Sequence, residues 1–351
     1  MLAAVPARAN SSISYDFNNM TQWLSHELAQ GLAFNAGSNF DPPKEVKGYY
    51  LQPDLSFGAG VMPLDKRDFP KLTVQALQDA GGSGIFPNSV LFPNLALHLR
   101  MGLPWRGDAY FRFADATTPP GYKISPTMTA KVQTNSFGAG IRQHLFGGDY
   151  PTLTLGAHYN HVQGRTHLKG KFDQNIQNTL SLSSDLNGDI VWSINSFGLT
   201  AVVSQTFGNW TPFAGLGYNY ATGSVRARLD LEPSNPDSIT QAPAIGEGSD
   251  HPEQSQGREI FGLSYDRPTW SAFANGELKA LGQLQYRSYI VQVGAALPFD
   301  IGRGPAIIYK RRTPAPVEPK ALDRREPKPK VRRHLGPREP EQAPPDMIFL
   351  Q

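Results

Sequence analysis

Residues Leu95 to Trp105 read LALHLRMGLPW, with an apolar side chain at every odd-numbered position and Ala, His, Arg, Gly or Pro between them. Successive side chains of a β-strand point to opposite faces of the sheet. The stretch therefore predicts a strand with one face against an oily environment and the other against a polar or crowded one.

The same alternation recurs at 49–61, 153–159 and 289–299. These runs are longer than the roughly 5–6 residues of an ordinary soluble strand. The sequence contains no run approaching the roughly 18 apolar residues of a membrane-spanning helix. Strands can cross a membrane only as a closed barrel, in which every backbone N–H and C=O group has a hydrogen-bond partner. We therefore predict an all-β fold, a transmembrane antiparallel up-and-down β-barrel.

The composition favours a turn-rich protein. The 351 residues include 34 Gly and 30 Pro, only 18% are charged, and there is no Cys. A chain without Cys has no disulfide framework, no Cys-ligated zinc and no thiol catalysis.

Short turns alternate with longer polar stretches along residues 46–299, as periplasmic turns and outer loops do in membrane barrels. The short turns lie at 104–108, 147–149, 208–209 and 266–268, and the polar stretches at 63–87, 117–125, 167–186, 232–256 and 281–283. This spacing predicts ten strands, near 46–62, 88–104, 107–116, 125–146, 150–166, 187–207, 209–231, 257–266, 269–280 and 283–299. The count becomes twelve if 70–78 and 174–184 also span the membrane.

A repeated unit supports the hairpin interpretation. The motif NSFG at 135–138 recurs at 195–198, and GAHYN at 156–160 resembles GLGYN at 215–219. Either a duplicated strand–turn–strand unit or a shared composition of small and aromatic residues explains the match.

Two N-terminal features precede the predicted barrel. Residues 1–9 (MLAAVPARA) resemble the end of a secretory signal peptide with an A-x-A cleavage pattern, or are an ordinary N-terminal extension. Within segment 10–45, apolar residues at three- and four-residue spacing predict a helix over 17–30, with Asp16 as its N-cap and Gly31 just beyond its end. We expect this periplasmic helix to plug the lumen, lie on the membrane surface or pack at the barrel mouth.

Residues 300–351 differ in composition from the predicted barrel at 46–299. From Lys310 onward there are 11 Lys+Arg against 6 Asp+Glu, interspersed with Pro. This composition predicts a disordered, basic periplasmic tail.

Six cationic side chains share the polar parity of the predicted strands: His98, Arg100, Arg112, Arg142, His144 and His158. A charge on the lipid face costs about 2–4 kcal/mol at the bilayer midplane, so we predict that they face the lumen. They would either form a cationic ring that favours anions in a narrow pore, or pair with carboxylates such as Asp54 in a small, closed lumen.

The sequence offers little for catalysis or metal binding. It contains no G-x-S-x-G elbow, no H-E-x-x-H and no phosphate loop, and Asp250-His251 lies in the acidic stretch 232–256 without predicted rigid support. His158 and His161 differ in parity and would lie on opposite faces of a strand. We predict no cofactor, no metal site and no enzymatic activity.

The last predicted strand carries Gln292, Gly294, Leu297 and Phe299 at the spacing of a barrel-assembly signal. Residues 16–299 resemble functionally uncharacterised bacterial outer-membrane barrels with an N-terminal helix, and are only loosely similar to the long-chain fatty-acid transporter family. The resemblance implies a Gram-negative outer-membrane protein, surrounded by the lipid bilayer and assembled by the barrel insertion machinery.

Two functions fit these predictions. The first is a porin-like passive channel or transporter for small or apolar solutes. The alternative is a non-conducting scaffold whose extracellular loops or periplasmic tail bind a partner in envelope scaffolding, adhesion or secretion. We expect peptidoglycan or a periplasmic protein as partners of the tail, and no nucleic acid.

Overall fold

The computed structural model describes residues 7–38, 42–46, 48, 50–74, 77–78, 82–119, 121–125, 128–147, 150–176, 180–233, 244–283, 285 and 287–300. These residues belong to one compact unit, Met1–Gly304. The predicted tail from residue 301 onward and the first six residues of the predicted signal remnant lie outside the described residues.

Ten strands close into an antiparallel ring. In ring order they are β1 (Tyr50–Pro63), β2 (Ser89–Leu103), β3 (Gly107–Thr117), β5 (Met128–Phe146), β6 (Thr152–Ile176), β7 (Leu180–Ser204), β8 (Trp210–Pro233), β10 (Ser255–Asp266), β11 (Ser271–Leu281) and β12 (Tyr289–Ala296), which pairs back with β1. The predicted ten-stranded barrel is confirmed. The twelve-strand alternative is wrong, because no described residue of 70–78 is in a strand, and 174–176 and 180–184 belong to β6 and β7, which pair with each other.

Shorter elements complete the described fold. Strand β4 (Tyr122–Ser125) pairs with β5, β9 (Ala244–Asp250) pairs with the later part of β8, and β13 (Phe299–Asp300) pairs with β1. Three short 3₁₀ helices are η1 (Lys66–Asp68), η2 (Gly82–Ile85) and η3 (Pro104–Arg106). The long α-helix is α1 (Ala7–Ala36), and the described residues Leu77 and Gln78 are also α-helical.

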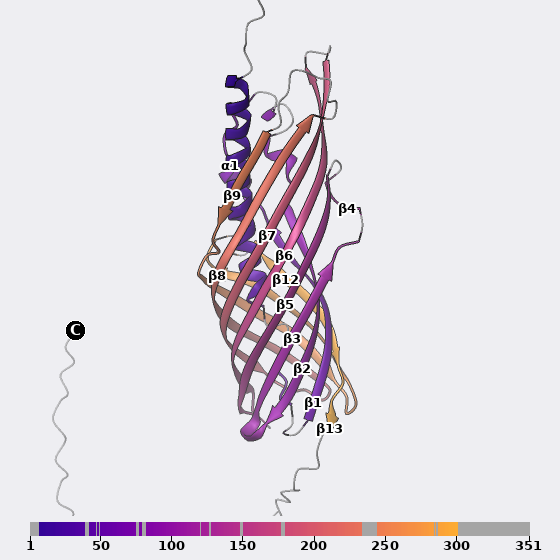
Figure 1. The fold of residues 1–351 in the computed structure, drawn as a ribbon. Coiled ribbons are helices and arrows are strands. Elements are labelled where there is room, and N and C mark those ends of the chain that lie inside the picture. Colours follow the sequence, from indigo (N-terminus) through magenta and orange to yellow (C-terminus); the bar gives the residue numbers. More distant parts are fainter. Residues whose placement is uncertain are drawn as a thin grey trace, which may run out of the picture. The chain divides into compact units, whose positions relative to one another are not determined.

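The two ends of the ring differ (Figure 1). At the turn end, short connections follow β2, β5, β7 and β10, as predicted. At the hairpin end, β6, β7 and β8 extend beyond their neighbours. The predicted loop 167–186 is therefore largely paired strand, because the outward positions change there from apolar to polar residues while the hydrogen-bonded ladder continues.

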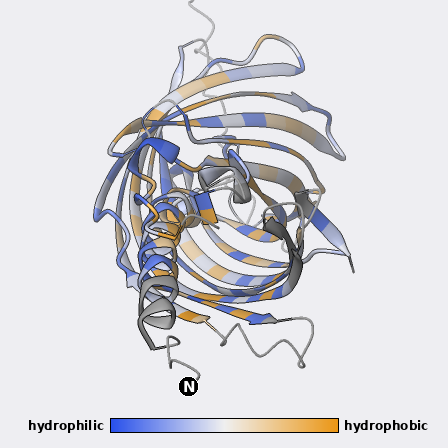
Figure 2. Ribbon diagram, turned by 90° about the horizontal axis from the view of Figure 1, so that it is seen from above, coloured by the Kyte–Doolittle hydropathy of each residue, from blue (hydrophilic) through white to orange (hydrophobic). Residues whose placement is uncertain are grey.

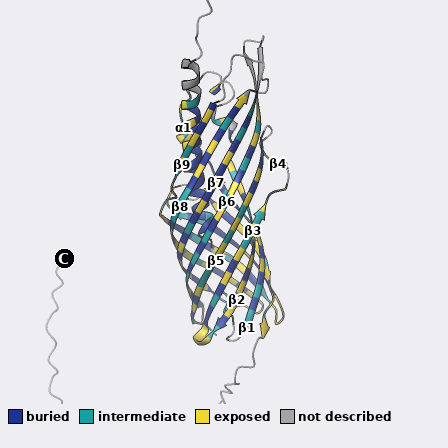
Figure 3. Ribbon diagram, in the orientation of Figure 1, coloured by how far each residue is buried: buried dark blue, intermediate teal, exposed yellow. Residues whose placement is uncertain are grey.

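The outer surface of the ring carries an apolar belt. Inward and outward side chains alternate between buried and exposed along the strands, and the bands of hydropathy follow them (Figures 2 and 3). The belt includes the exposed side chains of Leu55, Phe57, Leu97, Phe113, Phe137, Ile141, Phe197, Leu199, Leu216, Phe261 and Val293. From Tyr150 to Tyr159, strands tilted by about 40° at about 3.3 Å per residue cover about 23 Å of membrane thickness. The ring is therefore a transmembrane β-barrel in a lipid bilayer.

Helix α1 extends beyond both predicted ends. Asp16 does not cap it, because its carboxylate accepts the backbone N–H groups of Thr73 (2.8 Å) and Val74 (2.8 Å) in the β1–β2 connection. Gly31 lies inside the helix, where a Cβ would collide with the side chain of Met62, so this residue permits close packing instead of ending the helix. Among the described residues, no helix is long and apolar enough to cross a membrane.

Helix α1 lies inside the ring, which agrees with the first of its three predicted positions, whereas the side of the membrane on which it begins stays a prediction. Its early residues contact the β1–β2 connection and β9 at the hairpin end, and the chain after Ala36 reaches the side chains beside the β2–β3 turn. The helix therefore runs inside the ring from the hairpin end toward the turn end, where β1 begins. Since the strand number is even, β12 also ends at the turn end of the barrel, whereas the first turn of α1 lies at the hairpin end.

Candidate functional site

Polar side chains at four-residue spacing attach α1 to the free edge of β9. The Asn18 Oδ1 accepts the N–H of Glu247 (2.9 Å). The Gln22 amide donates to the carbonyl of Ser249 (3.0 Å) and accepts its N–H (3.3 Å). An edge strand that would otherwise expose its backbone is thereby covered by helix side chains.

The same row continues along α1. His26 Nδ1 lies 2.7 Å from the Asp250 carboxylate, and Gln30 Oε1 accepts the N–H of Glu253 (2.9 Å). Asp250, which the sequence analysis placed in an unsupported loop, is thus held at the end of a strand. Strand β9 can approach this closely because Gly246 has no Cβ, which would otherwise meet the backbone of Phe17.

A neighbouring face of α1, about 100° around the helix axis, packs on the β1–β2 connection. Trp23 contacts the rings of Phe69 and Phe86, with centroids 4.9 and 5.5 Å away, and its indole N–H donates to the carbonyl of Asp65 (3.2 Å). Glu27 accepts the N–H of Asp65 (2.8 Å). Burial raises the pKa of Glu27 above its usual 4.5, and the hydrogen bond from Asp65 opposes this shift only in part.

The last residues of α1 and the chain that follows them fill the turn half of the ring. We call residues 34–38 and 42–44 the plug. Its backbone carbonyls accept hydrogen bonds from the wall: Phe34 from Arg258, Ala36 from Asn160, Gly37 from His158 and Asn219, Ser38 from Arg112 and Asn160, Pro42 from Arg142, Pro43 from Thr154, and Lys44 from Arg100. The orphan carbonyls at the C-terminus of a helix need such partners.

Asp108 organises the cations nearest the turn end. Its carboxylate accepts from Arg142 Nε (2.8 Å) and lies 2.7 Å from His144 Nε2 and 3.5 Å from Arg100 Nη2. All four side chains are buried. Asp108 therefore compensates two buried guanidinium groups that also hold plug carbonyls.

The structure places all six predicted lumen residues inside the ring, each at most 6% exposed. His98 pairs with Asp54 (2.6 Å), and the others contact the plug, Asp108 or both. What they do in function stays a prediction. The sequence analysis did not single out the buried pair Arg258–Glu277 or the pair Lys279–Glu253. Arg258, Glu277 and Lys279 are buried and share the inward parity of β10 and β11, so the same argument applied to them, whereas Glu253 is partly exposed and precedes β10.

The sequence repeat coincides with two plug contacts. Asn160 and Asn219 are equivalent positions of the GAHYN and GLGYN motifs, and both donate to carbonyls of the plug. Each faces the glycine of an NSFG motif across the strand pair, Gly138 for Asn160 and Gly198 for Asn219. The repeat thus supplies matched pairs of small residue and amide on the lumen wall.

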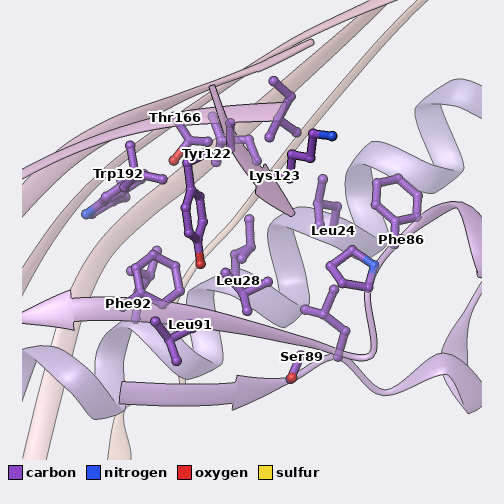
Figure 4. Close-up of a pocket in the computed structure, with 18 residues that line it drawn as sticks. Leu24, Leu28, Phe86, Ser89, Leu91, Phe92, Tyr122, Lys123, Thr166 and Trp192 are labelled. Atoms are coloured by element: carbon purple, nitrogen blue, oxygen red, sulfur yellow. The ribbon is translucent and has the colours of Figure 1, made fainter. Parts of the chain in front are cut away.

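The hairpin half of the ring has an apolar interior with a cavity of about 140 Å³. One wall is α1, through Leu24, Leu28 and Leu32, and the opposite wall includes Ile190 and Trp192 of β7 (Figure 4). The remaining lining residues are Leu64, Phe86, Pro87, Ser89, Val90, Leu91, Phe92, Tyr122, Lys123, Ala130, Val132, Thr166 and Leu168.

This cavity lies where the barrel wall loses a strand pair. Strand β2 pairs with β1 along 89–101 but with β3 only along 96–103, so 89–95 have no strand partner on that side among the described residues. Strand β4 pairs with β5 and leaves this edge of β2 uncovered. Because 89–92 and 122–123 both line the cavity, its mouth lies between β2 and β4, beside the exposed side chains of Leu91 and Lys123.

The remaining predicted positions lie elsewhere. His161 and His167 face outward, where they contact Asn195 and Asp189, and no cluster of three metal-ligand side chains occurs among the described residues. In the proposed assembly signal, Gln292 is buried, Gly294 is half-buried, and Leu297 and Phe299 are exposed on the belt. Whether this motif directs assembly stays a prediction.

No family model and no curated sequence matches the chain. Solved structures similar to it include the translocator domain of the autotransporter NalP from Neisseria meningitidis (13% identity, covering 76% of this chain and 92% of that one, TM-score 0.33). Others are the outer membrane protease OmpT from Escherichia coli (12%, 73% and 99%, TM-score 0.35) and a Pseudomonas aeruginosa FadL homologue (9%, 82% and 98%, TM-score 0.25). At these TM-scores the likenesses assign no activity, substrate or partner. The closed ring and its apolar belt identify this chain as an outer-membrane-type β-barrel.

The prediction that the chain is not an enzyme is corrected. A protease is among the similar barrels, so absent sequence motifs do not exclude catalysis in this architecture.

Proposed function

We propose that this outer-membrane barrel binds small apolar molecules in the cavity between α1 and the wall and passes them across the membrane beside its closed lumen. The observation that carries the proposal is the cavity of about 140 Å³ at the unpaired edge of β2. By the general pattern of such barrels, the hairpin end faces outward and the turn end faces the periplasm.

The cavity size sets the class of molecule. An apolar cavity of about 150 Å³ stays dry and binds benzene or xenon. The cavity here has nearly that volume, 140 Å³, and its lining is predominantly aliphatic and aromatic. A single aromatic ring or a short hydrocarbon segment is therefore the expected ligand.

The closed turn half argues against a water-filled route. The plug carbonyls accept bonds from cations of the wall, and those cations are compensated by buried carboxylates. A molecule in the cavity instead lies next to the gap between β2 and β4, from which the apolar belt continues at Leu95 and Leu97. Release through the wall into the bilayer requires no passage through the charged half.

Bromobenzene binding tests the proposal, because a bromine atom in the cavity quenches the fluorescence of Trp192. The folded chain in detergent is expected to show a saturable quenching component. Ala130→Phe places a ring in the cavity and should remove that component, whereas Thr129→Phe, on the outer face of the same strand, should retain it. Equal quenching in both variants, or no saturable component in the unaltered chain, would refute the proposal.

The closed lumen also favours the second hypothesis, a non-conducting barrel that binds a partner through its outer loops or its tail. Deleting 310–351 distinguishes the two. Apolar ligand binding should survive the deletion, whereas capture of peptidoglycan or a periplasmic protein through the tail would be lost.

A further inference from the structure

The outer face of β5 to β8 changes its chemistry in a fixed order toward the hairpin end. The apolar belt ends in an aromatic cluster, where Phe137 lies 6.2 Å from Tyr159 and Tyr159 lies 4.9 Å from Phe197. The aromatic girdle of a membrane barrel marks the boundary between hydrocarbon and headgroups. The surface beyond it therefore faces the polar layer of the membrane.

Next along these strands comes a row of hydrogen-bonding side chains. Asn135, Gln163 and Ser193 are successive cross-strand partners, and all three are exposed. They line a surface hollow of about 600 Å³ whose other polar lining residues are Asp115, Thr117, Gln133, Thr134 and Arg165. Amide and hydroxyl groups that both donate and accept match the hydroxyl groups of a saccharide.

A pair of arginines follows. Arg165 and Arg226 flank the exposed Val191 as its cross-strand partners on β6 and β8. Their backbones are about 10 Å apart, twice the strand spacing, and they lie about 15 Å beyond Tyr159 along the membrane normal. Unlike Arg228, which pairs with Asp230 and Glu247, neither has an ion-pair partner among the described residues. Arginine is well suited to phosphate because its guanidinium group donates two parallel hydrogen bonds.

We propose that this surface, which we call the saccharide face and define by Gln133, Asn135, Gln163, Ser193, Arg165 and Arg226, binds the phosphorylated saccharide headgroup of a glycolipid in the surrounding leaflet. The order of chemistries along the wall is the order within such a lipid. Acyl chains lie on the belt, sugar hydroxyls meet the amides, and phosphates meet the arginines. The face is continuous with the established membrane contact, and its free cations complement the phosphates.

The proposal does not depend on the apolar cavity, because the saccharide face lies on the outside of the wall. Its test is native mass spectrometry of the full folded chain in detergent, titrated with lipopolysaccharide. Three probes separate the possible sources of binding: intact lipopolysaccharide, lipopolysaccharide treated with phosphatase, and phosphatidylglycerol.

Arg165→Gln/Arg226→Gln should weaken lipopolysaccharide binding by about tenfold or more, the loss expected when charge-assisted hydrogen bonds are removed. The matched control Lys71→Gln/Arg267→Gln removes the same charge from other exposed positions and should bind as the unaltered chain does. Heat-modifiable gel migration verifies that both variants are folded.

Lysine at both positions keeps the charge but not the paired donors, and should restore binding only in part. Equal lipopolysaccharide affinity of Arg165→Gln/Arg226→Gln and the control Lys71→Gln/Arg267→Gln would overturn the proposal. It would also fall if phosphatase treatment left binding unchanged, or if phosphatidylglycerol displaced lipopolysaccharide at equal concentration.

Discussion

Replacing Asp108 by Asn is expected to loosen the turn half of the barrel. The substitution keeps the size of the side chain and removes a negative charge that faces Arg142 at 2.8 Å, His144 at 2.7 Å and Arg100 at 3.5 Å. Breaking a buried ion pair by removing one partner costs about 3–5 kcal/mol, because a buried charge is left uncompensated. Since a whole domain is stable by about 5–15 kcal/mol, the loss is large.

The assay is urea unfolding of the purified protein, followed by the mobility difference between folded and boiled protein on a gel. The matched control is Asp115→Asn, an exposed carboxylate at the other end of β3, which should change the free energy of unfolding by no more than about 0.5 kcal/mol. If Asp108→Asn lost less than about 1 kcal/mol, the pairing of buried charges would not be what holds the plug and wall together.

Three further predictions follow from the fold. In planar bilayers the full chain should be silent because the plug occupies the turn half, and deletion of 7–46 should produce stable conductance steps; steady conductance of the full chain would contradict a closed lumen. Because burial raises the pKa of Glu27, its ionisation costs stability as pH rises from the usual 4.5 through the raised value. Glu27→Gln should therefore raise the unfolding midpoint above that of the unaltered chain at pH 7.5 and leave it unchanged near pH 4. The same difference between variant and unaltered chain at both pH values would contradict this prediction. In intact cells an impermeant maleimide should label Tyr15→Cys, 58% exposed near the start of α1, and should label Trp105→Cys, 87% exposed at the turn end, only after permeabilisation; the reverse pattern would place the hairpin end in the periplasm.

The barrel could be predicted from the sequence because lipid imposes apolar residues at every outward position of a spanning strand. Where β6 and β7 leave the bilayer, that rule reverses. Leu168 and Ile190 point inward there, while Lys169 and Asp189 point outward. Because an outward polar residue in a paired strand looks like a loop residue in the sequence, β6 was predicted to end too early, at 166, and β7 to begin too late, at 187.

The lumen cations and the pairing of His98 with Asp54 were within reach of sequence arguments, but the backbone partners of the arginines were not. Arg100, Arg112 and Arg142 donate to backbone carbonyls of the plug, and a carbonyl acceptor leaves no trace in the identity of its residue. The contact of α1 with β9 was equally out of reach, because the side chain of Gln22 bonds to the main-chain groups of Ser249. The cavity was out of reach for another reason, because it depends on where β3 stops pairing with β2.

The most direct test of the apolar binding site is anomalous diffraction from crystals of the full chain equilibrated with bromobenzene. The account predicts a bromine peak between Leu28 of α1 and Trp192 of β7, and no such peak in Ala130→Phe crystals. Bromine found only in the detergent around the belt or within the polar turn half, with the cavity empty, would contradict it.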